Sequence, residues 1–174
     1  MSLDYSTQEL MIIASAREIK DNERIFVGMR LPITAYGVAR LTHAPNAVGL
    51  FESGIARYEP ADGMLYTMCD APNQLGAAWT CGLIQIMGML SGGRVHAGFI
   101  GGAEIDKFGN INTSYIGGIE NPKVKLPGSG GAADIAAMSQ RLIAIMNHEK
   151  HRLVEKVEFI TSPGFLDGGD ARKR

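Results

Sequence analysis

Short apolar runs alternate with segments of helical periodicity along this chain, and this alternation is what most limits the folds open to it. The apolar runs have the length of strands and lack the polar alternation of a half-buried strand. The predicted strands are Arg24–Gly28, Ala47–Phe51, Val95–Ile100, Val124–Leu126 and Val157–Thr161. The predicted helices are Gln8–Lys20, with a cap at Ser6 or Thr7, the segment from Leu31 to near His43, Gly76–Leu90 and Asp134–Met146.

Strands that are apolar on both faces and separated by helices indicate an α/β fold with an open, mostly parallel sheet and flanking helices. Ligands bind such sheets beyond the carboxyl ends of the strands, so the residues that follow each strand are the first site candidates. These are Glu52, the turn Gly101–Glu104 and the loop Pro127–Gly131. The chain has no internal repeat or low-complexity tract, and we expect a single domain over residues 1–174.

Charge and hydropathy argue against two classes of partner. The 17 basic and 18 acidic residues give a net charge of −1, which indicates no basic surface for nucleic acid. No apolar run approaches the ~20 residues of a membrane helix, and Met1–Asp4 lacks the basic start of a signal peptide. We therefore expect a cytoplasmic protein that binds neither nucleic acid nor membrane. Cys69 and Cys81 lack metal-site spacing and are interpreted as two buried thiols.

Glu52 leaves an apolar strand and enters a turn of small residues, Ser53-Gly54. A carboxylate there can act as a covalent nucleophile, because small neighbours let a bulky substrate approach. Position alone favours the simpler alternative, a strand-end glutamate in solvent or in an ion pair.

A second cluster follows the strand that ends at Ile100. Gly101 and Gly102 allow backbone N–H groups to face a ligand. Gly109-Asn110 is a strong turn signal, and Asn112 beyond it offers a side-chain amide. The alternative is an ordinary hairpin with a polar tip, and the sequence favours neither.

A third cluster, Gly128–Ala133, precedes a predicted helix, where free N–H groups can hold an anion or an oxyanion. The stretch also fits the dinucleotide fingerprint G-x-G-x-x-A, which requires an acid at the end of the next strand. That strand ends at Ile160-Thr161-Ser162, so NAD binding is disfavoured. His148 and His151 are three residues apart rather than four, which argues against an H-E-x-x-H metal site.

Together the three clusters resemble the B subunit of glutaconate CoA-transferase and its relatives. In that family the catalytic glutamate lies in a Glu-Ser-Gly turn, here Glu52-Ser53-Gly54. The family's Gly-Gly-Ala-x-x-Asp-x-x-Gly-Asn-x-Asn segment is matched completely by Gly101–Asn112. The further matches, in order, are Pro122-Lys123, Gly128–Ala132, His148–Lys150 and Thr161–Gly164. The resemblance covers nearly the whole chain.

The resemblance implies an enzyme that moves CoA between an acyl-CoA and a small carboxylic acid. Glu52 would attack the thioester to give an anhydride, and CoA thiolate would convert this to a glutamyl-CoA thioester. The enzyme would work with a separately encoded A-type subunit. CoA is then a co-substrate, and neither a tightly bound cofactor nor a metal is implied.

The resemblance also assigns the supporting site residues. The Gly128–Gly131 loop would stabilise the oxyanion, with Gly130 or Gly131 as donor. Gly101 and Gly102 belong to the expected CoA-binding set. Asn112, or Asn110 as the second choice, would position the glutamate or the CoA amide.

Two alternatives keep the same fold. One is a relative that hydrolyses a CoA thioester or cleaves a ring on one, and the resemblance implies that such relatives lack the glutamate. The other is a ligand-sensing domain without catalysis, which an intact nucleophile disfavours. The segment Ile55–Gly76 departs from the family pattern and leaves the acyl group undefined. Family members usually continue beyond the Gly168–Arg174 tail, so the resemblance implies a short form or a missing C-terminal extension.

Overall fold

The computed structural model describes residues 4–63 and 65–173, so part of the Met1–Asp4 segment used above lies outside the described residues. The chain forms two compact units. The first comprises the residues up to Phe99 together with Met138–Ile145, and the second comprises Ile100–Ala137 together with the residues from Met146 onward. The expectation of one domain over residues 1–174 stays a prediction.

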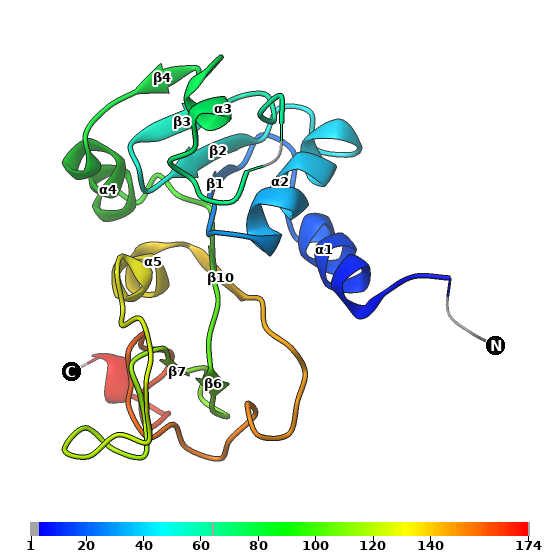
Figure 1. The fold of residues 1–174 in the computed structure, drawn as a ribbon. Helices are drawn as coiled ribbons and strands as arrows, with labels where there is room; N and C mark the ends of the chain where they lie inside the picture. Colours follow the sequence, from blue (N-terminus) through cyan, green and yellow to red (C-terminus); the bar gives the residue numbers. More distant parts are fainter. Residues whose placement is uncertain (1–3, 64, 174) are drawn as a thin grey trace. The chain divides into compact units, whose positions relative to one another are not determined.

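A six-stranded open sheet forms the centre of the first unit (Figure 1). Its order is β10 (Arg141–Ala144), β5 (Ala97–Ile100), β1 (Arg24–Phe26), β2 (Val48–Phe51), β3 (Ile55–Arg57) and β4 (Trp79–Thr80). Strands β5, β1 and β2 pair in parallel, whereas β2, β3 and β4 pair in antiparallel fashion. The predicted α/β class, with an open sheet that is parallel at its centre and flanked by helices, is confirmed.

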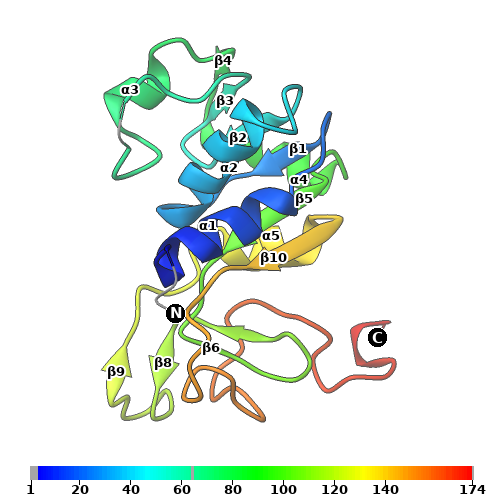
Figure 2. The same ribbon diagram turned by 90° about the vertical axis from the view of Figure 1, so that its right-hand side faces the viewer.

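Helices α1 (Thr7–Arg17) and α2 (Leu31–Leu41) lie on one face of this sheet (Figure 2), and α4 (Leu83–Ser91) lies on the other. Helix α1 begins as predicted, since the Ser6 hydroxyl accepts from the Glu9 N–H at 3.2 Å. The Glu9 carboxylate completes a capping box by accepting from the Ser6 N–H at 2.7 Å.

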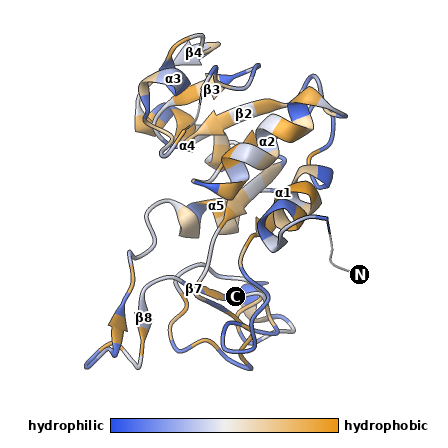
Figure 3. Cartoon of the chain, turned by 45° about the vertical axis from the view of Figure 1, so that its right-hand side comes forward, coloured by the Kyte–Doolittle hydropathy of each residue, from blue (hydrophilic) through white to orange (hydrophobic). Residues whose placement is uncertain are grey.

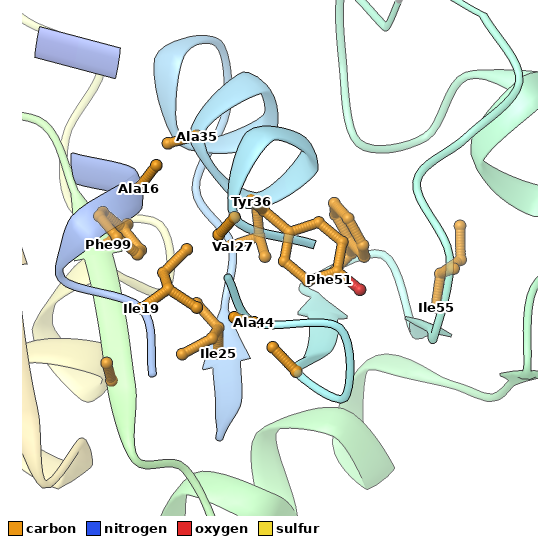
Figure 4. Close-up of a cluster of buried hydrophobic side chains, with 13 residues drawn as sticks. Ala16, Ile19, Ile25, Val27, Ala35, Tyr36, Ala44, Phe51, Ile55 and Phe99 are labelled. Carbon is orange, nitrogen blue, oxygen red and sulfur yellow. The ribbon is translucent and has the colours of Figure 1, made fainter. Parts of the chain in front are cut away.

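The central strands are buried on both faces, as their composition predicts. In β1, Ile25 contributes to the core under α1 and α2, and its neighbour Phe26, on the opposite face, is equally buried. Figure 4 shows Ile25, Val27, Tyr36 and Phe51 meeting between the sheet and these helices. Hydrophobic colour runs along β2 in Figure 3.

Two helix predictions are wrong in part. The segment Gly76–Leu90 becomes helical only at Leu83, because Trp79–Thr80 pairs with β3 as strand β4. The helix expected over Asp134–Met146 is α5 (Ala132–Met138), and Arg141–Ala144 is strand β10. The Arg141 N–H donates to the His96 carbonyl at 3.0 Å. The backbone of this segment therefore pairs along the edge of the sheet beside β5 instead of continuing the helix.

The second unit contains short antiparallel pairs. Strand β6 (Glu104–Ile105) pairs with β7 (Ile111–Asn112), and β8 (Tyr115–Ile116) pairs with β9 (Val124–Lys125), where a strand was predicted. A 3-10 turn, η1 (Ala171–Lys173), follows near the end. The strand predicted over Val157–Thr161 is wrong, because this segment forms no ladder and only the residue after it, Ser162, makes an isolated bridge with Ile111. No helix within the described residues is long and apolar enough to cross a membrane.

Candidate active site

The Glu52 turn is a three-residue loop that joins β2 to β3. Phe51 and Ile55 form the last antiparallel pair, and the Gly54 N–H donates to the Phe51 carbonyl at 2.9 Å. Gly54 has a φ of +88°, the left-handed conformation that closes a three-residue hairpin loop. The Glu-Ser-Gly sequence therefore places Glu52 at the first position of a tight turn at the end of a central strand.

Gly54 is also required by its surroundings. The Cys81 N–H donates to the Gly54 carbonyl at 2.7 Å, and a Cβ added at Gly54 would overlap the Cys81 carbonyl oxygen. The segment before α4 therefore lies directly against the Glu52 turn. Cys69 is exposed and Cys81 is half-buried, so the interpretation as two buried thiols is wrong, although both are free.

Glu52 is half-buried. None of the ion pairs found within residues 4–63 and 65–173 includes it. Its neighbour Ser53 turns away to donate from its hydroxyl to the Met68 carbonyl at 3.1 Å. The ion-paired alternative for Glu52 is therefore not observed among the described residues, whereas the alternative of a glutamate in solvent stays open.

A cavity of about 340 Å³ lies in the first unit between α2 and the segment after β3. Its walls are mainly apolar and include Phe51, the residue before Glu52, and Leu65. Arg57 and Asn73 bring polar groups to it. The segment Ile55–Gly76, which the sequence left undefined, thus forms one wall of a cavity beside the strand that carries Glu52.

In the second unit, Gly109-Asn110 forms the predicted hairpin turn between β6 and β7. The Asp106 carboxylate inside it accepts from the backbone N–H groups of Phe108 and Asn110 at 2.9 and 3.0 Å, and from the Asn110 side chain at 3.0 Å. Burial of Asp106 opposes its ionisation, but these hydrogen bonds outweigh burial and lower its pKa.

Asn110 and Asn112 are buried and fully engaged by the chain itself. The Asn110 amide donates to Asp106 and Leu166 and accepts from the N–H groups of Gly164 and Leu166. The Asn112 amide donates to Glu104 at 2.8 Å and to the Tyr115 carbonyl at 2.7 Å, and accepts from the Ser114 and Tyr115 N–H groups. In this state both side chains hold the hairpin together.

The two glycine segments of the second unit converge on strand β7. A Cβ at Gly102 would lie 2.6 Å from the Ile111 side chain. Beyond β7, the Gly128 N–H donates to the Thr113 carbonyl at 2.8 Å, and the Thr113 hydroxyl donates to the Gly128 carbonyl at 2.7 Å. The second and third sequence clusters are thus neighbours.

The loop before α5 has the backbone that its glycines predict. Gly128 has a φ of +95° and Gly130 a φ of +47°. Gly130 is exposed, and a Cβ there would meet nothing within 4 Å. Gly131 is buried and its carbonyl accepts from the Ile135 N–H at 3.0 Å, so it belongs to the first turn of the helix. Gly101, like Gly130, is exposed.

Comparison with known protein families gives a match over nearly the whole chain. The family described as coenzyme A transferase matches residues 8–174. This chain belongs to the coenzyme A transferase family.

Two relatives and one solved structure describe the position within the family. The chain is 40% identical to the B subunit of 3-oxoadipate CoA-transferase from Pseudomonas knackmussii and 34% identical to the B subunit of glutaconate CoA-transferase from Acidaminococcus fermentans. Each match covers 98% of this chain and 65% of the relative, so the chain spans just under two thirds of their length. The crystal structure of the Acidaminococcus glutaconate CoA-transferase superposes with a TM-score of 0.87 at 30% identity, over 98% of this chain and 66% of that one.

Sequence reasoning singled out Glu52 and both glycine segments, and the second unit brings Gly102, Asn110, Asn112 and Gly128 together. Sequence reasoning missed two buried polar residues of the first unit, Arg57 at the end of β3 and Asn73 in the segment after it. The only sequence signal for a buried Arg57 is that this arginine directly follows the apolar residues Ile55-Ala56.

Proposed function

We propose that this chain is the catalytic B-type part of a heteromeric CoA-transferase, with Glu52 as the covalent nucleophile. The observation that carries the proposal is the Glu52 turn of a family member: a half-buried carboxylate outside the observed ion pairs, on a loop fixed by Gly54. The two named relatives are both B subunits of CoA-transferases, which supports a partner A-type subunit for this chain.

The chemistry follows from a carboxylate that attacks a thioester. The Glu52 carboxylate adds to the acyl-CoA carbonyl, the carbon–sulfur bond breaks, and CoA leaves as a thiolate from an acyl-glutamyl anhydride. The thiolate then attacks the glutamyl carbonyl and expels the acid as its carboxylate, leaving a glutamyl-CoA thioester. An acceptor carboxylate reverses both steps and leaves with CoA.

Each addition creates an oxyanion that backbone N–H groups can stabilise. We assign this role to the Gly128–Gly131 loop, with Gly130 or Gly131 as donor, and CoA contacts to Gly101 and Gly102. Asn112 and Asn110 support the hairpin beside these segments, and a direct contact with substrate would require them to exchange their present partners.

The test is capture of the intermediate. Chain co-purified with its A-type partner is incubated with acyl-CoA and no acceptor, and intact-protein and peptide mass spectrometry looks for CoA on the peptide that contains Phe51-Glu52-Ser53. We expect the adduct in wild type and none in Glu52→Ala. Normal CoA exchange by Glu52→Ala would overturn the proposal.

The same assay addresses the substrate. Acceptor acids are compared in ping-pong kinetics, beginning with 3-oxoadipate and glutaconate because the two named relatives bear these names. Hydrolysis of the thioester without transfer to any acid would instead favour the hydrolase alternative.

A further inference from the structure

A relay of hydrogen bonds ties the Glu52 turn to the segment that follows β3. The Ser53 hydroxyl donates to the Met68 carbonyl at 3.1 Å. The same carbonyl accepts from Asn73 Nδ2 at 2.7 Å. Asn73, in the short helix α3 (Ala71–Gln74), is fully buried. One backbone carbonyl thus connects the residue beside the candidate nucleophile to a buried amide five residues further along the segment.

Arg57 holds this segment at both of its ends. Its guanidinium is buried, with the residue only 3% exposed. Nε donates to the Glu59 carbonyl at 2.8 Å and Nη2 to the Pro60 carbonyl at 3.1 Å. Nη1 donates to the Asn73 and Leu75 carbonyls at 2.8 and 2.7 Å. A buried cation needs such acceptors, so the segment must keep these carbonyls directed at the Arg57 guanidinium.

The relay leads directly into the sheet that carries Glu52. Arg57 is the last residue of β3, two residues after Ile55, which closes the Glu52 turn. Its own carbonyl accepts from the Tyr36 hydroxyl at 2.8 Å, which anchors it to α2. The Met68 side chain packs against the same core as Tyr36 and Phe51. The packing of the Met68 side chain and the Asn73 amide therefore hold the Met68 carbonyl in place, and the Arg57 guanidinium holds the backbone of Asn73.

We propose that Ser53, Asn73 and Arg57 are positioning residues, which orient the Glu52 turn through the Met68 carbonyl. The inference rests on the proposed function for its kinetic consequence, but the relay itself makes a structural claim that can be tested separately. Ser53 is the critical member, because it joins the relay to the turn by a single hydrogen bond.

Loss of a residue that positions Glu52 and loss of a residue that only stabilises the fold should have different effects on the kinetics of the enzyme. A misdirected nucleophile slows attack, and displacement of a reacting group by about 1 Å can cost about 100-fold in rate. Binding of acyl-CoA should be unaffected if the relay acts on Glu52 alone. The expected signature is a fall in the rate of glutamyl-CoA formation with little change in KM.

The variants are Ser53→Ala, which removes the hydroxyl, Ser53→Thr, which keeps it, and Asn73→Leu, which removes the amide donor at similar volume. Gln74→Ala is the matched control. Gln74 lies in the same helix and donates from Nε2 to the Cys69 carbonyl at 3.0 Å, a bond of the same kind that does not reach the turn.

We expect Ser53→Ala and Asn73→Leu to slow single-turnover formation of the glutamyl-CoA adduct by about tenfold or more. Ser53→Thr should recover most of the rate, and Gln74→Ala should match wild type. The double variant should be no slower than the slower single variant, because both act through one carbonyl. A wild-type rate in Ser53→Ala, or multiplicative losses in the double variant, would overturn the proposal.

Amide hydrogen exchange tests the relay without any substrate. The peptide covering residues 51–55 should exchange faster in Ser53→Ala and Asn73→Leu than in wild type and Gln74→Ala. If Asn73→Leu does not fold, Ser53→Ala alone decides. Absence of an adduct in wild type would refute the proposed function, whereas unchanged exchange at residues 51–55 in Ser53→Ala would refute the relay.

Discussion

Glu52 lies at the first position of a loop whose other two residues have separate tasks. Ser53 binds the Met68 carbonyl, and Gly54 supplies the positive φ and the close approach to Cys81. Ser53 and Gly54 thus each have a physical reason to be what they are.

The length of the Glu52 side chain should matter for attack. Glu52→Asp withdraws the carboxylate by one methylene, about 1.5 Å on ordinary bond geometry, and we expect transfer to fall by about 100-fold or more. The shifted carboxylate can still hold a water molecule, so residual turnover should appear as thioester hydrolysis. The measurement is free CoA release with and without an acceptor acid. Transfer at the wild-type rate would contradict a nucleophilic role.

Gly54 should be less replaceable than other glycines with positive φ. Gly93 has a φ of +66° and open space around it, so Gly93→Ala isolates the backbone cost, about 1 kcal/mol. Gly54→Ala adds the overlap with the Cys81 carbonyl, and we expect a loss of about 3 kcal/mol or more. Denaturant unfolding of both variants provides the comparison. Equal losses would show that the Cys81 contact is unimportant.

At the scale of elements, the candidate site residues of each unit lie on hairpins and loops at the ends of strands. The β2–β3 hairpin presents Glu52, and the β6–β7 hairpin supports the glycine segments of the second unit. The glycine loop before α5 and the Asp106 hairpin each allow a direct test.

The glycine loop should be sensitive in function and tolerant in folding. Gly130 is exposed and a Cβ there would meet nothing within 4 Å, so we expect the main cost of Gly130→Val to be the strain of a branched side chain at a positive φ. We expect near-normal circular dichroism and a fall in turnover of about 100-fold or more, because a side chain would obstruct the thioester carbonyl. Gly131→Val, at the buried neighbour, should also abolish transfer. Normal turnover in both variants would make the loop a structural turn only.

The β6–β7 hairpin should make stability depend on acid pH. The folded-state pKa of Asp106 is lowered, so its contribution is complete above the ordinary value of 3.8 and is lost as pH falls through the lower folded value. Asp106→Asn should therefore be less stable than wild type at neutral pH, and the difference should narrow toward about pH 2. Thermal unfolding as a function of pH measures this. A constant difference at all pH values would exclude the carboxylate as its cause.

At the scale of the whole molecule, this chain covers 65% of its named relatives and contains one candidate nucleophile and one candidate oxyanion loop. Those relatives are subunits, so we expect the functional unit to be larger than this chain.

The isolated chain should therefore be a poor transferase. We expect CoA exchange by the chain alone to be at least about 100-fold slower than by chain co-purified with an A-type subunit, because part of the oxyanion site would be absent. The assay follows labelled CoA between an acyl-CoA and a free acid at matched chain concentrations. Full activity of the chain alone would contradict the partnership.

Much of this architecture could be predicted from local sequence. The β1 and β2 strands are continuous apolar runs, Ser6 and Glu9 form a capping box, and Gly109-Asn110 makes a hairpin turn. The capping box and the hairpin turn depend on contacts between residues close in the sequence. The strands are predictable because they are buried on both faces, which only one class of fold allows.

Segments whose state depends on distant partners were beyond such reasoning. Trp79–Thr80 and Arg141–Ala144 read as helix but are strands, because their backbone groups find partners in β3 and β5. Val157–Thr161 reads as a strand but forms no ladder, because only its last residue reaches β7, where the Thr161 N–H donates to the Ile111 carbonyl. The sequence of a short apolar run does not show whether the fold places an unpaired sheet edge beside it.

The candidate site likewise has features that the sequence predicts and features that depend on the tertiary structure. The sequence by itself determined the family, the Glu-Ser-Gly turn and the glycine segments, since these depend on side chains and backbone freedom at fixed spacing. Only the tertiary structure decided that the Asn110 and Asn112 amides are used inside the hairpin, and that Arg57 and Asn73 lie behind the Glu52 turn. A buried polar group must find its partners wherever the fold places them, and that placement is set by the packing of the whole unit.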